Sequence, residues 1–293
     1  MSTTDSSIPY HLIPELLHHQ RLRSTPIKRE ASATAQRLTF NDGTSVFAKT
    51  TNRHREGFMR AEIEGLRWLR EASTAIVEVL YGSDDLLVEP WLEEVEPSRA
   101  AARSLGRELA AVHRCGAPTF GAPWRGFIGE LDMDNTETAS LRWSDWYAER
   151  RLRPFLRLSQ DNGALSSADV AAVEKLLGRI EELAGSEETP ARLHGDLWFG
   201  NVVWTPNGAR LIDPAAHGGH RETDLANLRL WGSTPFVDDI ITAYDEEYPL
   251  NDGWRERIGI HWLFPLLAHT ALFGRSFRGQ LMSVVTEYVN AGS

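Results

Sequence analysis

The sequence has a single cysteine, Cys115, so no disulfide can form within the chain. It has no apolar run long enough to span a membrane and no recognisable signal peptide. Positive charge is scarce, since 31 Lys and Arg residues stand against 41 Asp and Glu residues and the net charge is −10. These absences predict a cytoplasmic protein and argue against nucleic acid or an anionic membrane as a partner. The length of 293 residues allows two lobes with separate cores.

The stretch 192–216, ARLHGDLWFGNVVWTPNGARLIDPA, has two apolar runs on either side of an Asn-Gly turn. This pattern predicts a β-hairpin. The expected pairing is Val202 with Ile212 and Trp204 with Arg210.

In that pairing Asn201 and Asp213 face each other at the open end of the hairpin, about 5 Å apart. Two oxygen ligands of one Mg²⁺ ion, each about 2.1 Å from the metal, need so short a separation. Asp196 lies five residues before Asn201 on the approach loop. In phosphoryl transfer an Asp at such a position accepts the proton of the attacking hydroxyl, and the later Asn and Asp hold the metal. The alternative interpretation is that all three are turn and strand-end residues, because Asp and Asn favour turns.

The remaining elements follow from periodicity. Short β-rich runs at 25–27, 35–40, 45–49, 77–81 and 86–88 predict an antiparallel sheet. Helical spacing is found at about 5–19, 55–72, 97–113, 143–158, 169–183, 224–231, 238–247, 254–273 and 280–290. The segment 118–135 is expected to be a loop, and Asp224 is expected to cap its helix. His113, His261 and His269 are interpreted as structural residues, and His194 as a brace for the approach loop.

The motifs HGDLWFGN, IDPA and GHRETDLA (219–226) resemble those of the fructosamine kinase, or ketosamine-3-kinase, family. This family is one of a larger group of kinases built like aminoglycoside and choline phosphotransferases. The resemblance implies an α+β, two-lobed, protein-kinase-like fold. A small antiparallel-sheet N-lobe with one long helix, 1–90, is expected to bind nucleotide. A larger, mainly helical C-lobe, 91–293, is expected to carry catalysis and substrate binding.

The resemblance also implies an activity: ATP-dependent phosphorylation of the sugar of a free or protein-bound ketosamine at its 3-hydroxyl, which leads to deglycation. ATP and Mg²⁺ are the implied cofactors. Asp196 is then the catalytic base, and Asn201 and Asp213 are the metal ligands. Lys49 is expected to orient the phosphates, held by Glu62; from spacing alone, Lys49 is equally well a solvated lysine at a strand end.

By the same resemblance, the segment after the run LLVEPWLE joins the lobes, and the backbone around Glu89, Trp91 and Leu92 is expected to meet the adenine. The local composition is also that of an ordinary strand followed by a loop.

Substrate recognition is assigned to Trp198, His220 and Glu222. Trp198 lies two residues after the expected base, and an indole face suits the apolar face of a sugar; a core tryptophan is the equal alternative. His220 and Glu222 are also suited to capping the next helix.

The sequence departs from the family pattern in the loop 28–34, KREASAT, where phosphate binding would ordinarily use glycine. Ser32, Thr34 and the backbone are expected to serve instead. The family's loop cysteine is also missing, so no redox switch of that type is expected.

Three alternative functions are open. The first is an aminoglycoside- or choline-type kinase, against which the narrower motifs count. The second is a non-catalytic nucleotide-binding protein, favoured only by the glycine-free loop. The third is a metallohydrolase with His194, His217 and His220 as Zn²⁺ ligands, although no pair has the i, i+4 spacing of a zincin site. The oligomeric state has no signature in the sequence.

Overall fold

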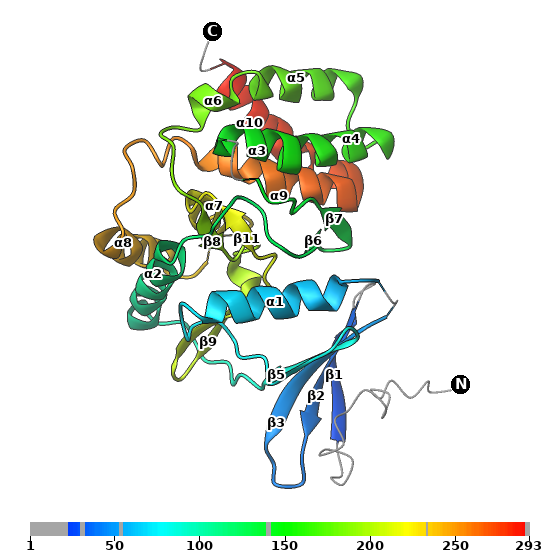
Figure 1. Ribbon diagram of the computed structural model, residues 1–293, viewed down its shortest axis with the longest axis vertical. Helices are drawn as coiled ribbons and strands as arrows, with labels where there is room; N and C mark the ends of the chain where they lie inside the picture. Colours follow the sequence, from blue (N-terminus) through cyan, green and yellow to red (C-terminus); the bar gives the residue numbers. More distant parts are fainter. Residues whose placement is uncertain (1–22, 30–32, 53–54, 139–141, 233, 291–293) are drawn as a thin grey trace.

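A computed structural model describes residues 23–29, 33–52, 55–138, 142–232 and 234–290. The predicted helix at 5–19 and Ser32 of the glycine-free loop lie outside these residues. The described elements form an antiparallel sheet at one end of the molecule and a larger, mainly helical part at the other (Figure 1). The predicted α+β architecture is therefore confirmed. No helix in these ranges is long and apolar enough to cross a membrane.

The sheet has five strands in the order β1-β2-β3-β5-β4, and all neighbours are antiparallel. Its strands are β1 (Arg23–Arg29), β2 (Ala33–Thr39), β3 (Ser45–Thr51), β4 (Tyr81–Gly82) and β5 (Leu86–Pro90). The β2–β3 turn uses the predicted Asp-Gly pair: Asp42 Oδ1 accepts a hydrogen bond from Thr44 N–H at 2.9 Å, and Gly43 has φ 86°. Because a left-handed φ favours glycine, this turn helps to fix the register of the strand that carries Lys49.

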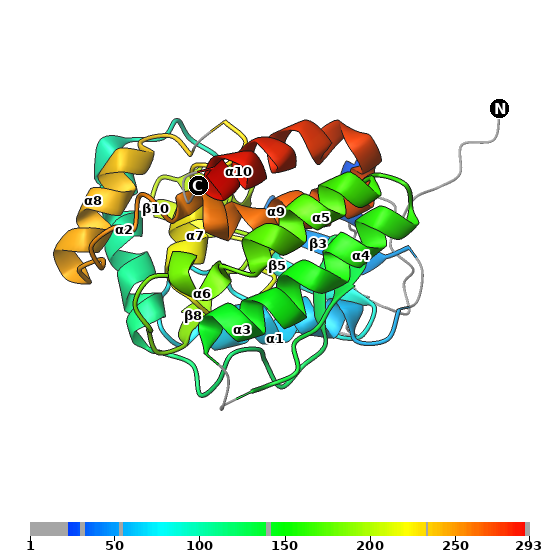
Figure 2. The ribbon, with the colours of Figure 1, turned by 90° about the horizontal axis from the view of Figure 1, so that it is seen from above.

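Nine of the described α-helices belong to the helical part, and α1, at the sheet end, is treated separately below. They are α2 (Arg99–Arg114), α3 (Trp143–Tyr147), α4 (Arg153–Asp161), α5 (Ser167–Leu177), α6 (Ile180–Leu183), α7 (Glu222–Asn227), α8 (Val237–Glu247), α9 (Ile258–Phe273) and α10 (Arg278–Asn290). As its apolar sequence predicts, α9 is central: α4, α7 and α10 pack against it, and Figure 2 shows α4, α5 and α10 gathered around it. The predicted helix at 143–158 is divided, because a π-helical turn, Ala148–Leu152, separates α3 from α4.

Three two-stranded ribbons complete the fold: β6 (Gly126–Ile128) with β7 (Leu131–Met133), β8 (Ala191–Leu193) with β11 (His217–Gly219), and β9 (Val202–Thr205) with β10 (Gly208–Leu211). The β6–β7 ribbon lies in the segment that was expected to be loop. Its strands of three residues are too short to give a periodic signal.

The β9–β10 hairpin forms, but the predicted register is wrong by one residue. Val202 pairs with Leu211 instead of Ile212, and Trp204 pairs with Ala209 instead of Arg210. Pairing continues to Thr205 and Gly208, which leaves a two-residue turn, and Gly208 has φ 96°. Two-residue loops suit the twist of a hairpin, so the tighter turn is preferred.

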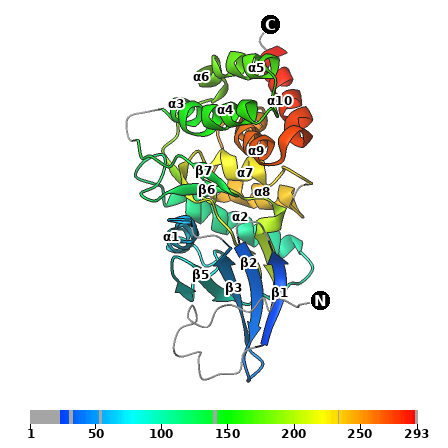
Figure 3. The ribbon, with the colours of Figure 1, turned by 90° about the vertical axis from the view of Figure 1, so that its right-hand side faces the viewer.

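Helix α1 (Phe58–Arg70) lies between the sheet and the helical part (Figures 1 and 3). Its buried side chains Met59, Ile63, Leu66 and Leu69 belong to one cluster with residues of α2, α8 and the β9–β10 hairpin. The sheet's own cluster is small and contains residues such as Leu38. The small sheet therefore buries little by itself, and α1 packs its apolar face into the helical part. The division of the chain into two lobes at residue 90 stays a prediction.

Helices α2 and α8 lie close together at Gly106. A Cβ on Gly106 would lie 2.1 Å from the Ile240 carbonyl oxygen, so the helices must separate to admit a methyl group. We expect Gly106→Ala to lower the free energy of unfolding by about 1–3 kcal/mol or more, measured by urea denaturation.

The matched control is Gly279→Ala in α10, where nothing lies within 4 Å of the added Cβ. Because alanine has the higher helix propensity, this variant should be as stable as the wild type or slightly more so. Equal stability of the two variants would contradict the close packing of α2 on α8.

Candidate active site

The loop between β8 and β9, residues 194–201, is held by one buried carboxylate, Asp224. Its Oδ2 accepts a hydrogen bond from His194 N–H at 2.7 Å, and its Oδ1 accepts one from Gly195 N–H at 2.9 Å. Burial acts to raise the pKa of Asp224, but the hydrogen bonds outweigh it and the pKa lies below its ordinary value. The predicted capping role is wrong, because Asp224 is the third residue of α7 and its carboxylate holds the loop instead.

Two histidines support this arrangement, as predicted. His113 of α2 contacts Asp224 Oδ2 through Nε2 at 3.1 Å and the Tyr244 hydroxyl through Nδ1 at 2.8 Å. His194 Nε2 lies 2.9 Å from the Ile212 carbonyl oxygen. The loop is thus connected to α2, to α7 and to the strand that precedes Asp213.

The turn at Gly195 presents Asp196. Gly195 has φ 81°, and a Cβ there would lie 2.2 Å from the Ala215 carbonyl oxygen, so only glycine fits. Burial raises the pKa of the Asp196 carboxyl to about 7, and the negative charge of Asp213 adds to this effect. A carboxylate whose pKa is near neutral pH is suited to accept a proton.

The structure brings Asn201 and Asp213 to Asp196. Asn201 Nδ2 donates to the Asp196 carbonyl oxygen at 2.8 Å and to Asp196 Oδ2 at 3.1 Å, and it lies 3.4 Å from the Asp213 carbonyl oxygen. Asp213 has φ 53°, which is uncommon for a residue other than glycine. Backbone strain of this kind, costing about 1–3 kcal/mol, is typical of functional sites.

Lys49 connects this group to the sheet. Its Nζ donates to both carboxylate oxygens of Glu62, at 2.9 and 2.8 Å, and to Asp213 Oδ1 at 2.6 Å. Burial acts to raise the pKa of Asp213, yet the Lys49 ammonium outweighs it and the pKa lies well below its usual range. The predicted pairing of Lys49 with Glu62 is confirmed, and Glu64 is half exposed beside Arg67.

The expected hinge residues Glu89, Trp91 and Leu92 lie at the C-terminal end of β5 and directly after it. Glu89 is buried near the end of β5, where burial and the negative charges of Glu62 and Asp213 raise its pKa well above the ordinary value. Trp91 lies under the Arg37 guanidinium, 4.4 Å from the ring centroid, and Leu92 packs against the apolar cluster of α1. Their contact with adenine stays a prediction.

A cavity of about 550 Å³ opens beside Asp196. Its walls come from α1, the β6–β7 ribbon, the 194–201 loop and the C-terminal end of α9. Among its lining residues are Lys49, Glu62, Asn201 and Asp213, together with Phe58, Phe127, Trp198, His269 and Phe273. Polar and aromatic side chains therefore share the wall of this cavity.

Trp198 lines this cavity and is half-buried, with its ring 4.9 Å from that of Phe199. His269, interpreted from the sequence as a packing residue, also lines the cavity, with its ring 4.0 Å from that of Trp231. Because the sequence of α9 is apolar on most faces, it does not indicate which face of the helix lines a cavity.

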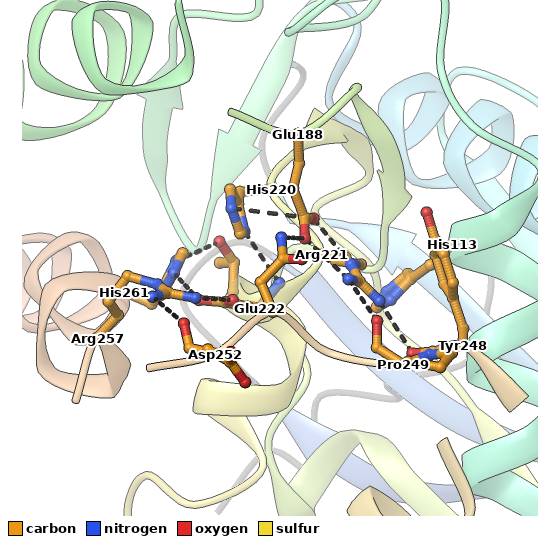
Figure 4. A network of polar contacts seen from close by, with 12 residues as sticks. His113, Glu188, His220, Arg221, Glu222, Tyr248, Pro249, Asp252, Arg257 and His261 are labelled. Carbon is orange, nitrogen blue, oxygen red and sulfur yellow. Dashed lines mark hydrogen bonds and ion pairs between the residues drawn. The ribbon is translucent and has the colours of Figure 1, made fainter. Parts of the chain in front are cut away.

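His220 and Glu222 do not reach the cavity. They lie in a buried polar network of the GHRETDLA segment (Figure 4), where the Arg257 guanidinium donates to both Glu222 oxygens at 2.6 and 3.0 Å. Glu222 N–H donates to His220 Nδ1 at 3.3 Å, and Glu222 is the first residue of α7. The expected sugar contacts are therefore not supported. Of the capping alternative, only the hydrogen bond from the first N–H of α7 to His220 is present, because the Glu222 carboxylate pairs with Arg257.

A metal-binding interpretation of the histidines is also unsupported. Among the described residues, the group with metal-ligand geometry is His220, Glu222 and His261, and it includes neither His194 nor His217. Glu222 is already neutralised by Arg257, and the His261 Nδ1 lies 2.9 Å from the Thr223 hydroxyl. Since protein partners satisfy these groups, the network needs no Zn²⁺.

This chain is similar to known proteins along most of its length. The fructosamine kinase family model matches residues 16–291. A probable ketoamine kinase of Enterococcus faecium is 31% identical over 247 residues, covering 83% of this chain and 87% of its own. A putative fructosamine-3-kinase from Thermobifida fusca is 42% identical with a TM-score of 0.88, covering 92% of this chain and 95% of that one. An aminoglycoside phosphotransferase, 15% identical with a TM-score of 0.63 and coverage of 95% and 98%, shows the fold alone.

The role of Asp224 can be tested by Asp224→Asn, which keeps the size of the side chain and removes its charge. Two N–H groups and His113 then lose a charged acceptor, which we expect to destabilise the protein by roughly 2–4 kcal/mol and to lower turnover at least tenfold. Thermal unfolding and steady-state kinetics measure the two effects.

Asp84→Asn is the control, because Asp84 is half exposed and pairs with Arg60 at the surface. It should change neither quantity appreciably. Wild-type turnover and stability in Asp224→Asn would show that the loop does not depend on this carboxylate.

Proposed function

Because the chain belongs to the fructosamine kinase family and is therefore a phosphotransferase with an alcohol acceptor, we propose that it phosphorylates the sugar of a ketosamine at the 3-hydroxyl, with ATP as donor. The observation that supports this most directly is the position of Asp196, which meets Asn201 within hydrogen-bond distance in the wall of a cavity that also has aromatic side chains. A fructosamine or ribulosamine-type adduct is the proposed substrate. Phosphate at C3, next to the carbonyl carbon, is a better leaving group than hydroxyl, so the product decomposes and the amine is released.

In this reaction Asp196 accepts the proton of the attacking 3-hydroxyl, and the hydroxyl oxygen attacks the γ-phosphorus of ATP. The bond from the γ-phosphorus to the β–γ bridging oxygen breaks, and ADP leaves. Phosphoryl transfer depends mainly on positioning and on stabilising charge. Lys49, which pairs with Glu62, is proposed to orient the phosphates. The backbone at Glu89, Trp91 and Leu92 is proposed to hold the adenine.

Asn201 and Asp213 fit Mg²⁺ by their donor chemistry. The hydrogen bonds of the Asn201 side chain within the described residues all use Nδ2, which leaves Oδ1 available. Asp213 is ionised beside Lys49, which contacts its Oδ1. Mg²⁺ prefers such oxygen donors and, when bound, neutralises charge on the phosphate oxygens.

The cavity supports a sugar as acceptor. Trp198 and other aromatic residues line it beside the carboxylate of Asp196. Aromatic faces pack on the apolar face of a sugar ring, while polar groups bind its hydroxyls. A volume of about 550 Å³ also leaves room for part of the amine that carries the sugar.

The first test of this function is Asp196→Asn. We expect kcat to fall by about 10²–10⁴ with little change in ATP binding, because the proton acceptor is lost while Asn201 and Asp213 remain. ADP release is measured with fructosyl-, ribulosyl- and erythrulosyl-amines, and with aminoglycosides and choline as competing acceptor classes.

Asp213→Ala provides the contrast, since it should weaken MgATP binding in calorimetry. A near wild-type rate in Asp196→Asn would remove Asp196 from the mechanism. Faster turnover of an aminoglycoside or choline than of every ketosamine would reject the proposed substrate.

The second test is Trp198→Ala. We expect KM for the ketosamine to rise at least about tenfold, with KM for ATP and the melting temperature nearly unchanged. The matched control is Trp254→Ala, because Trp254 is a buried core tryptophan that does not line the cavity. That variant should lose stability and keep its ketosamine KM. If Trp198→Ala instead lost stability and kept its ketosamine KM, Trp198 would be a core residue.

A further inference from the structure

Phe273, the last residue of α9, has two properties that the proposed mechanism does not use. It lines the cavity beside Asp196, and it is 58% exposed, more than any other large apolar side chain in the described part of the chain. A ring that lines a cavity and is also open to solvent lies at the mouth of that cavity. It offers apolar surface that a ligand extending out of the cavity would cover.

Phe273 belongs to a row of aromatic rings and is not an isolated surface residue. Its ring centroid lies 5.4 Å from that of His269 and 5.7 Å from that of Phe277. The His269 ring lies 4.0 Å from that of Trp231, which in turn lies 6.1 Å from that of Trp198. The row therefore runs from the loop 194–201 to the cavity mouth, and its rings support Phe273 at an exposed position.

The turn between β6 and β7 lies beside this end of α9. A Cβ on Gly129 would lie 3.2 Å from Leu272 Cδ1, so the turn and the end of the helix are in contact. Glu130 is the next residue of the turn, is exposed, and lines the same cavity as Phe273. The cavity mouth at this contact therefore has a carboxylate on the side of the turn and an aromatic ring on the side of the helix.

Among the described residues, the Glu130 carboxylate has no cationic partner. The arginines near the turn pair with another acid, since Arg55 lies 2.9 Å and Arg125 lies 3.3 Å from carboxylate oxygens of Asp132. Arg55 also donates a hydrogen bond to the Glu130 carbonyl oxygen. The backbone of the turn is thus held in place, while the charge of Glu130 is left available to a ligand.

The amine of a ketosamine matches both groups. Its nitrogen is bonded to C1 of the sugar and the attacked hydroxyl to C3, so a sugar whose 3-hydroxyl lies at Asp196 keeps the nitrogen close to the cavity. The nitrogen is protonated at neutral pH, and an ammonium is attracted by a carboxylate and by the face of an aromatic ring. An alkyl substituent on the nitrogen continues toward solvent, where it gains free energy by covering apolar surface.

We propose that Phe273 and Glu130 form a subsite for the amine part of the acceptor, in which the Phe273 ring contacts the alkyl substituent and the Glu130 carboxylate attracts the ammonium. The subsite rests on the proposed function, because it takes the acceptor to be a ketosamine bound at Asp196. It implies a preference for ketosamines whose amine has a long alkyl chain over those of small amines. A lysine side chain that carries the sugar has such a chain.

The first arm of the test compares the N-hexyl and N-methyl ketosamines of one sugar, fructose or ribulose, whichever the wild-type enzyme phosphorylates faster. We expect the wild-type kcat/KM to be at least about tenfold higher for the hexyl compound, because only its chain reaches Phe273. In Phe273→Ala this ratio should fall to within about twofold of unity. A general loss of activity affects both compounds equally and leaves the ratio unchanged.

Phe236→Ala is the matched control for this arm. Phe236 is also an exposed phenylalanine, at the start of α8, and it is not among the residues that line the cavity. This variant should keep the wild-type ratio. Because the Phe273 side chain is largely exposed, we expect Phe273→Ala to fold, which thermal unfolding checks.

The second arm compares the N-hexyl ketosamine with a neutral analogue in which an ether oxygen replaces the nitrogen. The wild type should prefer the ammonium, and Glu130→Gln should reduce that preference in kcat/KM about two- to fivefold, the size expected for an exposed ion pair. Glu64→Gln is the control, because Glu64 is half exposed beside Arg67 and is not among the residues that line the cavity. It should keep the wild-type preference.

An unchanged ratio in Phe273→Ala or in Glu130→Gln would overturn the subsite, and so would equal kcat/KM for the hexyl and methyl compounds in the wild type. In each of these cases the ketosamine is still phosphorylated, so the proposed function stands. Phosphorylation of none of the ketosamines would reject the proposed function itself, and the subsite with it.

Discussion

The loop 194–201, which carries the proposed base Asp196, depends on a single fully buried carboxylate. Asp224 has no contact with solvent, and an ionised group in that position costs several kcal/mol unless it is compensated. The compensation comes from the N–H groups of His194 and Gly195 and from the His113 ring. The same three hydrogen bonds that stabilise the charge therefore define the conformation in which Asp196 is presented. The geometry of the loop follows from the packing of α2 and α7, which lie outside the cavity.

This dependence gives a physical role to the GHRETDLA segment. Arg221 donates to both oxygens of Glu188 at 2.8 Å, and Glu222 pairs with Arg257 at 2.6 Å, so the start of α7 is fastened to two distant parts of the chain. Figure 4 shows both ion pairs within one polar network. Because α7 carries Asp224, the network fixes the carboxylate on which the loop depends. A motif rich in polar residues thus serves the scaffold, although its composition had suggested contacts with a sugar.

The sequence predicted contacts between residues that are near each other in the chain. It did not predict contacts between residues that are far apart in the chain. Asp196, Asn201 and Asp213 lie within 18 residues of each other, so their spacing alone predicted that they meet. Strand alternation and helical spacing likewise gave the sheet and α1. The burial of Glu222 depends on Arg257, 35 residues later, which no local pattern shows. The strands β6 and β7 are too short for periodicity, and the hairpin register depends on the geometry of one glycine turn.

The position of α1 explains how the two halves of the proposed reaction are aligned. On one face it supplies Glu62 to Lys49, and the same helix contributes Phe58 and Ala61 to the wall of the cavity. Its apolar face belongs to an apolar cluster of the helical part, which also includes Leu197 of the loop 194–201. A displacement of α1 would therefore disturb Lys49 and the cavity together. In the proposed reaction, the alignment of donor and acceptor then depends on a packed helix, which is more rigid than the loops on either side of it.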